Sequence, residues 1–93
     1  MTVYYEWDVE EVDVNEDIQH HNHTASYVEA KRIAETPDEI GMTSRIVLVR
    51  DDDKGRAWAY MEDGKLPEHF EDAHGVEIAK VPKRFNAEVE RAS

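Results

Sequence analysis

The chain has 93 residues, and its 22 Asp and Glu against 11 Lys and Arg give a formal charge of −11. This length predicts a single domain over residues 1–93 with a small core. The negative charge argues against direct binding of nucleic acid or of an anionic membrane, and the absence of cysteine excludes disulfides, thiolate catalysis and cysteine-ligated metals.

The first strand is predicted from an alternation of apolar and polar residues. Its apolar positions are Val3, Tyr5, Trp7 and Val9. The alternation changes phase at Glu10 and Glu11, which indicates a β-bulge or the end of the strand. A turn follows at residues 15–17, and Ile18 is expected to begin a short second strand that returns alongside the first.

A capping box predicts the start of the main helix, with Ser26 as the N-cap and Glu29 reaching back to it. One face of this helix is apolar and carries Tyr27, Ala30, Ile33 and Ala34. Pro37, at a first helical position, predicts at most one further turn before Gly41.

The second half of the chain begins with a predicted β-hairpin. Residues 45–50 form a strand that is apolar on both faces, and residues 56–62 form its partner after a turn. Residues 65–75 are expected to be a loop anchored in the core by Phe70. A short strand over residues 76–81 and a short helix after Pro82 complete the chain.

Short links between consecutive strands favour antiparallel pairing. The fold class is therefore expected to be α+β, with a small antiparallel sheet of three to five strands, one main helix packed on it and a short C-terminal helix.

The acidic residues are concentrated near the N-terminus, because residues 1–30 contain eight Asp or Glu and no Lys or Arg. Alternate residues of the first strand lie roughly 6.5–7 Å apart and are expected on its solvated face. Such a row can dock on a basic groove that normally holds nucleic acid. The expected partner-binding residues are Glu6, Asp8, Glu10, Glu11, Asp13, Glu16 and Asp17. The alternative is that this charge serves only solubility.

The stretch His20-His21-Asn22-His23 could supply imidazole ligands to zinc, nickel or copper. In an extended segment His21 and His23 share one side and His20 lies opposite. The third ligand that a catalytic zinc would need is suggested to be His69, His74 or a carboxylate such as Asp17. The alternative interpretation is a solvated loop that leads into the helix.

Most of the aromatic residues are expected to form the core. The alternative is that Tyr4 or Trp58 lies exposed and anchors a partner. No phosphate-binding loop or nucleophile motif is present, so the chain is expected to be non-enzymatic and to need no cofactor. Residues 46–49 are the longest aliphatic run and are too short to span a bilayer. The N-terminus lacks the features of a signal peptide, so a cytoplasmic location is expected.

The stretch RAWAYMEDGKLP at residues 56–67 resembles a set of small uncharacterised bacterial and phage proteins. The resemblance extends to YEWDVEE at residues 5–11 and VPKRF at residues 81–85. It implies a shared fold unit and no known activity.

A weaker similarity links AKRIA at residues 30–34 and WAYMEDGK at residues 58–65 to small anti-CRISPR proteins of phages. It implies binding of effector complexes, in many members through acidic surfaces. This chain departs from them in its longer C-terminus, where residues 82–92 add a helix.

The leading hypothesis is a non-enzymatic acidic binding protein, most concretely an anti-CRISPR or nucleic-acid mimic. Its expected partner is a protein with a basic surface, with no direct nucleic acid and no membrane involved. The alternatives are a metal-binding protein that uses the histidine cluster at residues 20–23, or a housekeeping protein whose acidity serves solubility.

Overall fold

The computed structural model describes residues 2–36 and 41–92, and within them the chain forms six strands and two helices. The first half comprises β1 (Tyr4–Val12), β2 (Ile18–Thr24) and α1 (Tyr27–Glu35). The second half comprises β3 (Thr43–Asp52), β4 (Gly55–Tyr60), β5 (His69–Glu71), β6 (Glu77–Lys80) and α2 (Lys83–Arg91).

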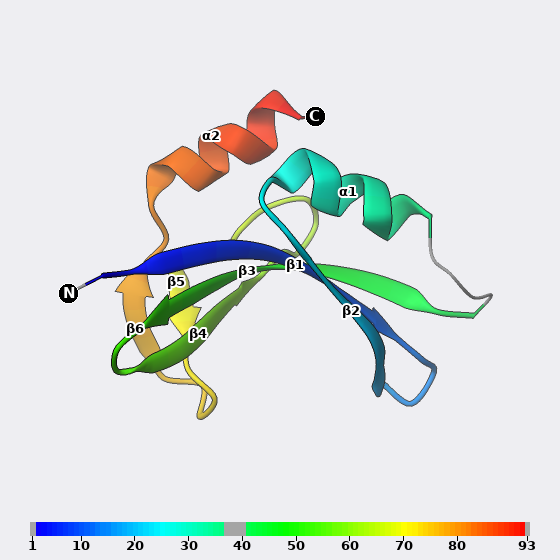
Figure 1. The fold of residues 1–93 in the computed structure, drawn as a ribbon, viewed down its shortest axis with the longest axis horizontal. Helices are drawn as coiled ribbons and strands as arrows, with labels where there is room; N and C mark the ends of the chain where they lie inside the picture. Colours follow the sequence, from blue (N-terminus) through cyan, green and yellow to red (C-terminus); the bar gives the residue numbers. More distant parts are fainter. Residues whose placement is uncertain (1, 37–40, 93) are drawn as a thin grey trace.

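All six strands belong to one antiparallel sheet with the order β2-β1-β3-β4-β5-β6. Strand β1 therefore lies between β2 and β3, and Asp8 is flanked by His23 on one side and Val47 on the other. Both helices lie on the same side of the sheet (Figure 1). No helix of the described residues covers the other side.

The main core lies between the sheet and the helices. Tyr5 and Trp7 of β1 point toward this layer, because the Tyr5 ring packs at a tilt against Phe85 at 4.9 Å and the Trp7 ring against Tyr27 at 5.1 Å between ring centroids. Leu48 and Phe70 are fully buried in the same cluster. The alternation expected for the first strand is thus confirmed on its apolar side.

The start of α1 is held by two side chains. Ser26 is its N-cap, and Ser26 Oγ accepts a hydrogen bond from Glu29 N at 3.3 Å, as the capping box predicts. Glu88 of α2 also accepts a hydrogen bond from Tyr27 N at 2.6 Å. A carboxylate at a helix N-terminus is favoured by the free amides there. This contact joins the two helices.

The α+β class and the antiparallel sheet are confirmed, but the sheet has six strands and the expectation of three to five was too low. The strand expected to begin at Ile18 forms β2 and continues through the histidines to Thr24, where a solvated loop was the alternative. The additional strand β5 lies where a loop around Phe70 was expected. These segments lack a clear apolar alternation, so neighbouring strands determine their structure.

The short C-terminal helix is confirmed as α2, whereas α1, expected to be the main helix, is no longer than α2, with nine residues each. Strand β1 continues through the phase change to Val12, with a register shift against β2 after Glu11. The turn expected after Pro37 lies outside the described residues. No helix in residues 2–36 and 41–92 is long and apolar enough to cross a membrane.

Candidate functional site

The side of the sheet opposite the helices carries polar side chains that contact one another across neighbouring strands. We call this side the open face. Cross-strand partners point to the same side of a sheet, so the register determines which residues share this face. Its polar and aromatic members are Glu6, Asp8, Glu10, His21, His23, Arg45, Trp58, Tyr60 and Glu71.

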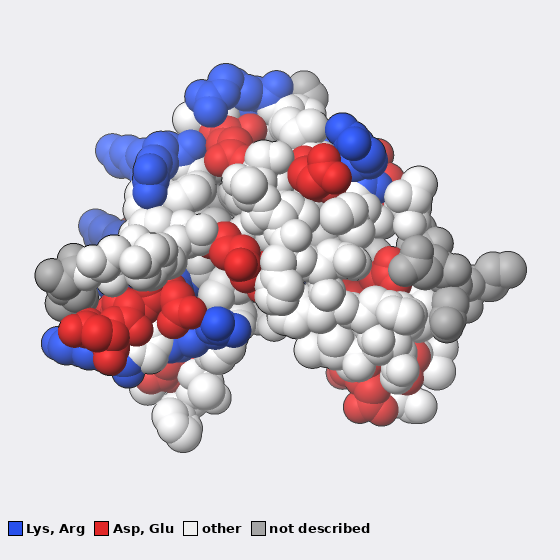
Figure 2. Space-filling model, viewed as in Figure 1, with Lys and Arg blue, Asp and Glu red and all other residues white. Residues whose placement is uncertain are grey.

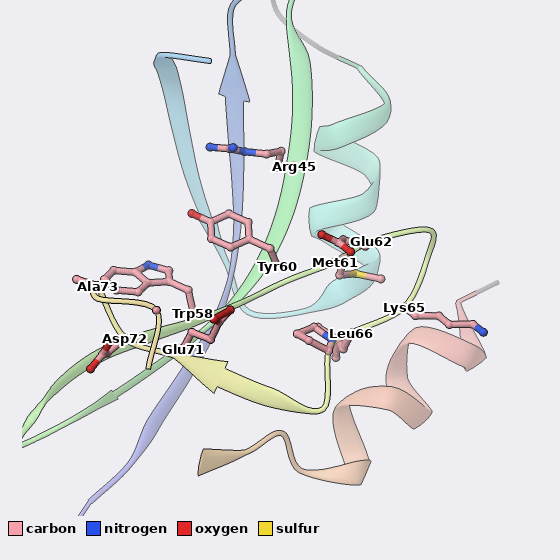
Figure 3. A pocket seen from close by; sticks show the side chains of 12 residues that line it. Arg45, Trp58, Tyr60, Met61, Glu62, Lys65, Leu66, Glu71, Asp72 and Ala73 are labelled. Carbon is pink, nitrogen blue, oxygen red and sulfur yellow. The ribbon is translucent and has the colours of Figure 1, made fainter. Parts of the chain in front are cut away.

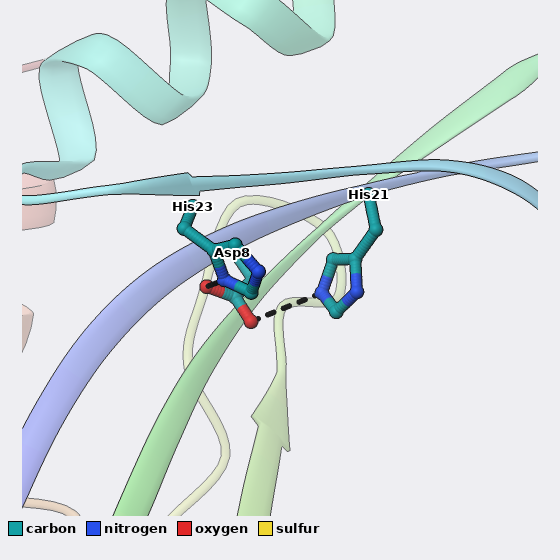
Figure 4. Close-up of side chains that lie close together, drawn as sticks. All are labelled: Asp8, His21 and His23. Atoms are coloured by element: carbon teal, nitrogen blue, oxygen red, sulfur yellow. Dashed lines mark hydrogen bonds and ion pairs between the residues drawn. The ribbon is translucent and has the colours of Figure 1, made fainter.

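A cluster of three potential metal ligands lies at the β1–β2 pair. Asp8 Oδ2 lies 3.0 Å from His21 Nε2, and Asp8 Oδ1 lies 3.0 Å from His23 Nδ1. The two imidazole rings are 4.7 Å apart, and one ligand atom from each of the three residues falls within 4.8 Å of the others. Figure 4 shows both rings extending from β2 toward the Asp8 carboxylate on β1.

This geometry is close to that of a zinc site. Tetrahedral Zn²⁺ with bonds of about 2.0–2.1 Å places its ligand atoms roughly 3.3 Å apart. The two 3.0 Å contacts involve different oxygens of Asp8, and a set of one ligand atom from each residue lies within 4.8 Å, so side-chain rotation must bring the three atoms around one ion. Asp8 is 1% exposed, whereas both histidines are exposed. An ion could therefore enter from solvent and rest on a carboxylate fixed in the sheet.

Glu6 adds a second carboxylate, because Glu6 Oε2 lies 2.7 Å from the same His23 Nδ1. Hydrogen bonds to Asp8 and Glu6 raise the pKa of His23. Burial raises the pKa of Asp8, and Glu6 raises it further, whereas the hydrogen bond from Asp8 lowers the pKa of Glu6. The two adjacent carboxylates therefore favour a positive charge beside them, which a protonated His23 or a cation can supply.

A second polar cluster lies one residue pair further along β1. Glu10 is 3% exposed, and one of its oxygens accepts a hydrogen bond from Arg45 Nη2 at 2.9 Å. Tyr60 donates its hydroxyl to Glu10 at 2.9 Å. Burial and the contact with Glu10 raise the pKa of Tyr60 to about 12, so the phenol stays protonated and remains a donor. The buried charge of Glu10 is thereby compensated.

Asp8 and Glu10 are not solvated as the expected row on β1 requires, and Glu11, a further expected partner-binding residue, is buried as well. Asp8 and Glu10 point to the open face as expected, but the side chains around them bury both. Glu11 is 1% exposed and lies on the helix-covered side, two residues beyond Val9. Figure 2 shows acidic side chains in separate groups on the face drawn, with basic side chains over α2, over α1 and beside the acidic group at the lower left.

The remaining expected partner-binding residues lie toward the two ends of β1 and in the turn that follows it. Glu6 is partly exposed beside the histidines, whereas Glu16 and Asp17 are exposed in the turn between β1 and β2. Asp13 organises that turn, because its carboxylate accepts hydrogen bonds from Asn15 N at 2.8 Å and Asp17 N at 3.1 Å. These hydrogen bonds lower the pKa of Asp13.

The histidines fall as the strand periodicity predicts. His21 and His23 share the open face, and His20 lies on the other side of β2. The third member of the cluster found in the described residues is a carboxylate, as one of the suggestions had it, but it belongs to Asp8, and His69, His74 and Asp17 lie outside that cluster. The register of β1 with β2, which periodicity alone does not give, places Asp8 directly opposite His23.

Comparisons with protein-family models, with curated proteins and with solved structures found no match to this chain. The expected resemblance to phage proteins therefore stays a prediction, and the functional argument rests on the open face.

Proposed function

We propose that this protein binds a divalent transition-metal ion, zinc foremost, through Asp8, His21 and His23. The observation that supports this proposal is the convergence of one carboxylate oxygen and two imidazole nitrogens within 4.8 Å of one another. Two imidazoles and one carboxylate form a ligand set that suits zinc, and nickel and copper also favour imidazole. The proposal is one of binding and includes no catalytic step.

Three protein ligands leave a fourth position on a tetrahedral ion. Glu6 is the candidate that we propose for this position, because it contacts the same nitrogen of His23 as Asp8 does. It could ligate the ion directly or accept a hydrogen bond from a bound water. Its partial exposure leaves room for either arrangement.

Isothermal titration calorimetry with Zn²⁺ and Ni²⁺ tests the proposal. We expect one ion per chain, and at least tenfold weaker binding in Asp8→Asn and in His21→Ala, at the lower end of what even outer-shell changes cost. His74→Ala is the matched control, because His74 is exposed and lies outside the cluster. Equal affinity in the wild type and in Asp8→Asn would refute the site.

A second candidate function keeps the acidic-surface hypothesis in a narrower form. We propose that the acidic turn of Asp13, Glu16 and Asp17 docks on a basic surface of a partner protein in the cytoplasm. Glu16 and Asp17 are exposed there, and no Lys or Arg lies within residues 1–30. The most concrete form is a phage-type inhibitor, an anti-CRISPR or nucleic-acid mimic, that occupies a basic surface of a nucleic-acid-handling complex.

The test of this second function is affinity capture from host lysate at low salt, with elution by rising salt. We expect a partner that elutes as salt screens the charges and that is lost when Glu16→Lys and Asp17→Lys are combined. Asp53→Lys combined with Glu68→Lys is the control, because it changes the net charge equally at exposed positions elsewhere. Capture that is equally reduced in both double variants would show a net-charge effect and contradict docking by the turn.

A further inference from the structure

A cleft of about 890 Å³ lies on the open face, between β4, the loop over residues 61–67 and the turn over residues 71–75. Figure 3 shows Arg45, Tyr60, Trp58 and Glu71 around it. Its wall is apolar at Met61, Leu66 and Pro67. Its charged lining residues are the three acids Glu62, Glu71 and Asp72 and the two cations Arg45 and Lys65. The cleft shares no residue with the three-residue metal cluster.

One side chain of the protein itself, Arg45, shows how groups in the cleft can bind a cation. The guanidinium of Arg45 lies 5.3 Å from the centre of the Tyr60 ring, and its Nη2 lies 2.9 Å from Glu10 Oε1. This arginine is therefore held between an aromatic ring and a carboxylate. Both contacts attract a guanidinium, one through the ring quadrupole and one through a charge-assisted hydrogen bond.

A second aromatic ring and a second carboxylate, those of Trp58 and Glu71, lie together one step along the sheet. Trp58 lies two residues before Tyr60 on the same side of β4, and Glu71 of β5 is its direct cross-strand partner. Trp58 is half-buried and Glu71 is exposed. Among residues 2–36 and 41–92, no Lys or Arg pairs with Glu71 or lies over the Trp58 ring.

We propose that this cleft docks an arginine side chain of a partner protein, with its guanidinium stacked on Trp58 and paired with Glu71. Arginine suits the site better than lysine, because a planar guanidinium can stack on an indole and bind a carboxylate with two parallel hydrogen bonds. Glu62 and Asp72 also line the cleft, and the net charge of −11 steers basic segments toward the molecule.

The test is an NMR titration of ¹⁵N-labelled protein, in the presence of EDTA, with the blocked peptide Gly-Gly-Arg-Gly-Gly. Matched peptides carry citrulline or lysine in place of arginine. We expect the indole N–H signal of Trp58 and the amide signal of Glu71 to shift with the arginine peptide. Citrulline, which keeps the shape and loses the charge, should cause no shift, and lysine should bind at least about threefold more weakly.

Two variants separate docking in the cleft from general charge attraction. Glu71→Gln should weaken binding about fivefold, whereas Glu68→Gln, at an exposed position outside the cleft, should leave it unchanged. Because Glu71 is exposed, its substitution leaves the core intact. Trp58→Phe keeps a ring and should retain weaker binding.

The proposal would be overturned if the citrulline peptide bound equally well or if Glu71→Gln had unchanged affinity. It would also be overturned if the shifts were confined to residues outside the cleft.

Discussion

Asp8 on β1 and His23 on β2 are cross-strand partners, and Asp8 Oδ1 lies 3.0 Å from His23 Nδ1. Asp8 is 1% exposed, whereas the side chain of His23 is 55% exposed. The pair therefore has a fixed end inside the sheet and an accessible end at the surface. Ligands on two adjacent paired strands are held in register by the backbone, which is a favourable basis for a metal site.

Metal binding should stabilise the fold, because the ligands converge only in the folded chain. Zn²⁺ at a hundredfold excess over its dissociation constant adds about 2.7 kcal/mol to the free energy of unfolding. For a domain of this size that corresponds to a rise in Tm of roughly 10–20 °C. Differential scanning calorimetry with Zn²⁺ and with EDTA measures it.

The control for this stabilisation is His23→Ala, which removes one ligand from the exposed end of the cluster. We expect its Tm to rise far less with Zn²⁺ than that of the wild type. A rise of equal size in both proteins would mean that the ion binds elsewhere.

Without metal, stability should fall as the pH rises above about 6.5. The pKa of His23 is raised above 6.5 by Asp8 and Glu6, so its contribution is fully present below 6.5 and is lost as the pH rises through the folded-state pKa. The pKa of Asp8 is also raised, from 3.8, so loss of its proton with rising pH likewise lowers the stability. Thermal unfolding in EDTA across pH 6 to 8.5, a range that brackets histidine titration, measures this.

The variant His23→Gln should flatten that decline, since it removes the group whose charge is lost. Added Zn²⁺ should oppose the decline in the wild type, because the metal needs deprotonated ligands and replaces the lost positive charge. A decline of the same steepness in His23→Gln would assign the pH dependence to other groups.

The ion pair of Arg45 with Glu10 should matter more than its exposed counterpart, Arg56 with Asp51. The two arginine side chains are 38% and 49% exposed, but Glu10 is nearly buried whereas the Asp51 side chain is 42% exposed. Arg45→Met leaves a buried carboxylate with only Tyr60 to compensate it, at a cost of about 2 kcal/mol in free energy of unfolding. Arg56→Met should cost less than about 1 kcal/mol.

Urea denaturation of the two variants measures both costs. A smaller loss of stability in Arg45→Met than in Arg56→Met would contradict the role assigned to the buried carboxylate.

The apolar side of the fold was predictable because burial selects it directly. The spacing of Tyr5, Trp7 and Val9 indicates the core side of β1. The sequence also predicts Phe70 as a core anchor, although it does not predict the strand β5 that carries it. The middle of β3 is buried on both faces, as its unbroken apolar sequence predicted. These positions depend on local periodicity alone.

The polar face was predictable only in part, because it depends on contacts between distant segments. Periodicity correctly placed Asp8 and Glu10 opposite the core, but it could not show that His21, His23, Arg45 and Tyr60 would cover them. The charge count near the N-terminus therefore suggested an exposed row. The register of β1 with β2 was the missing information, since it pairs Asp8 with His23 and Glu10 with His21.

The most direct measurement of the metal site is the ¹⁵N chemical shift of the imidazole nitrogens, recorded in long-range proton–nitrogen NMR spectra before and after one equivalent of Zn²⁺. The geometry predicts that His21 Nε2 and His23 Nδ1 shift to values typical of metal-bound nitrogen. The imidazoles of His20, His69 and His74 should keep their shifts. Unchanged spectra of His21 and His23, or coordination through the other histidines, would contradict the proposed metal site.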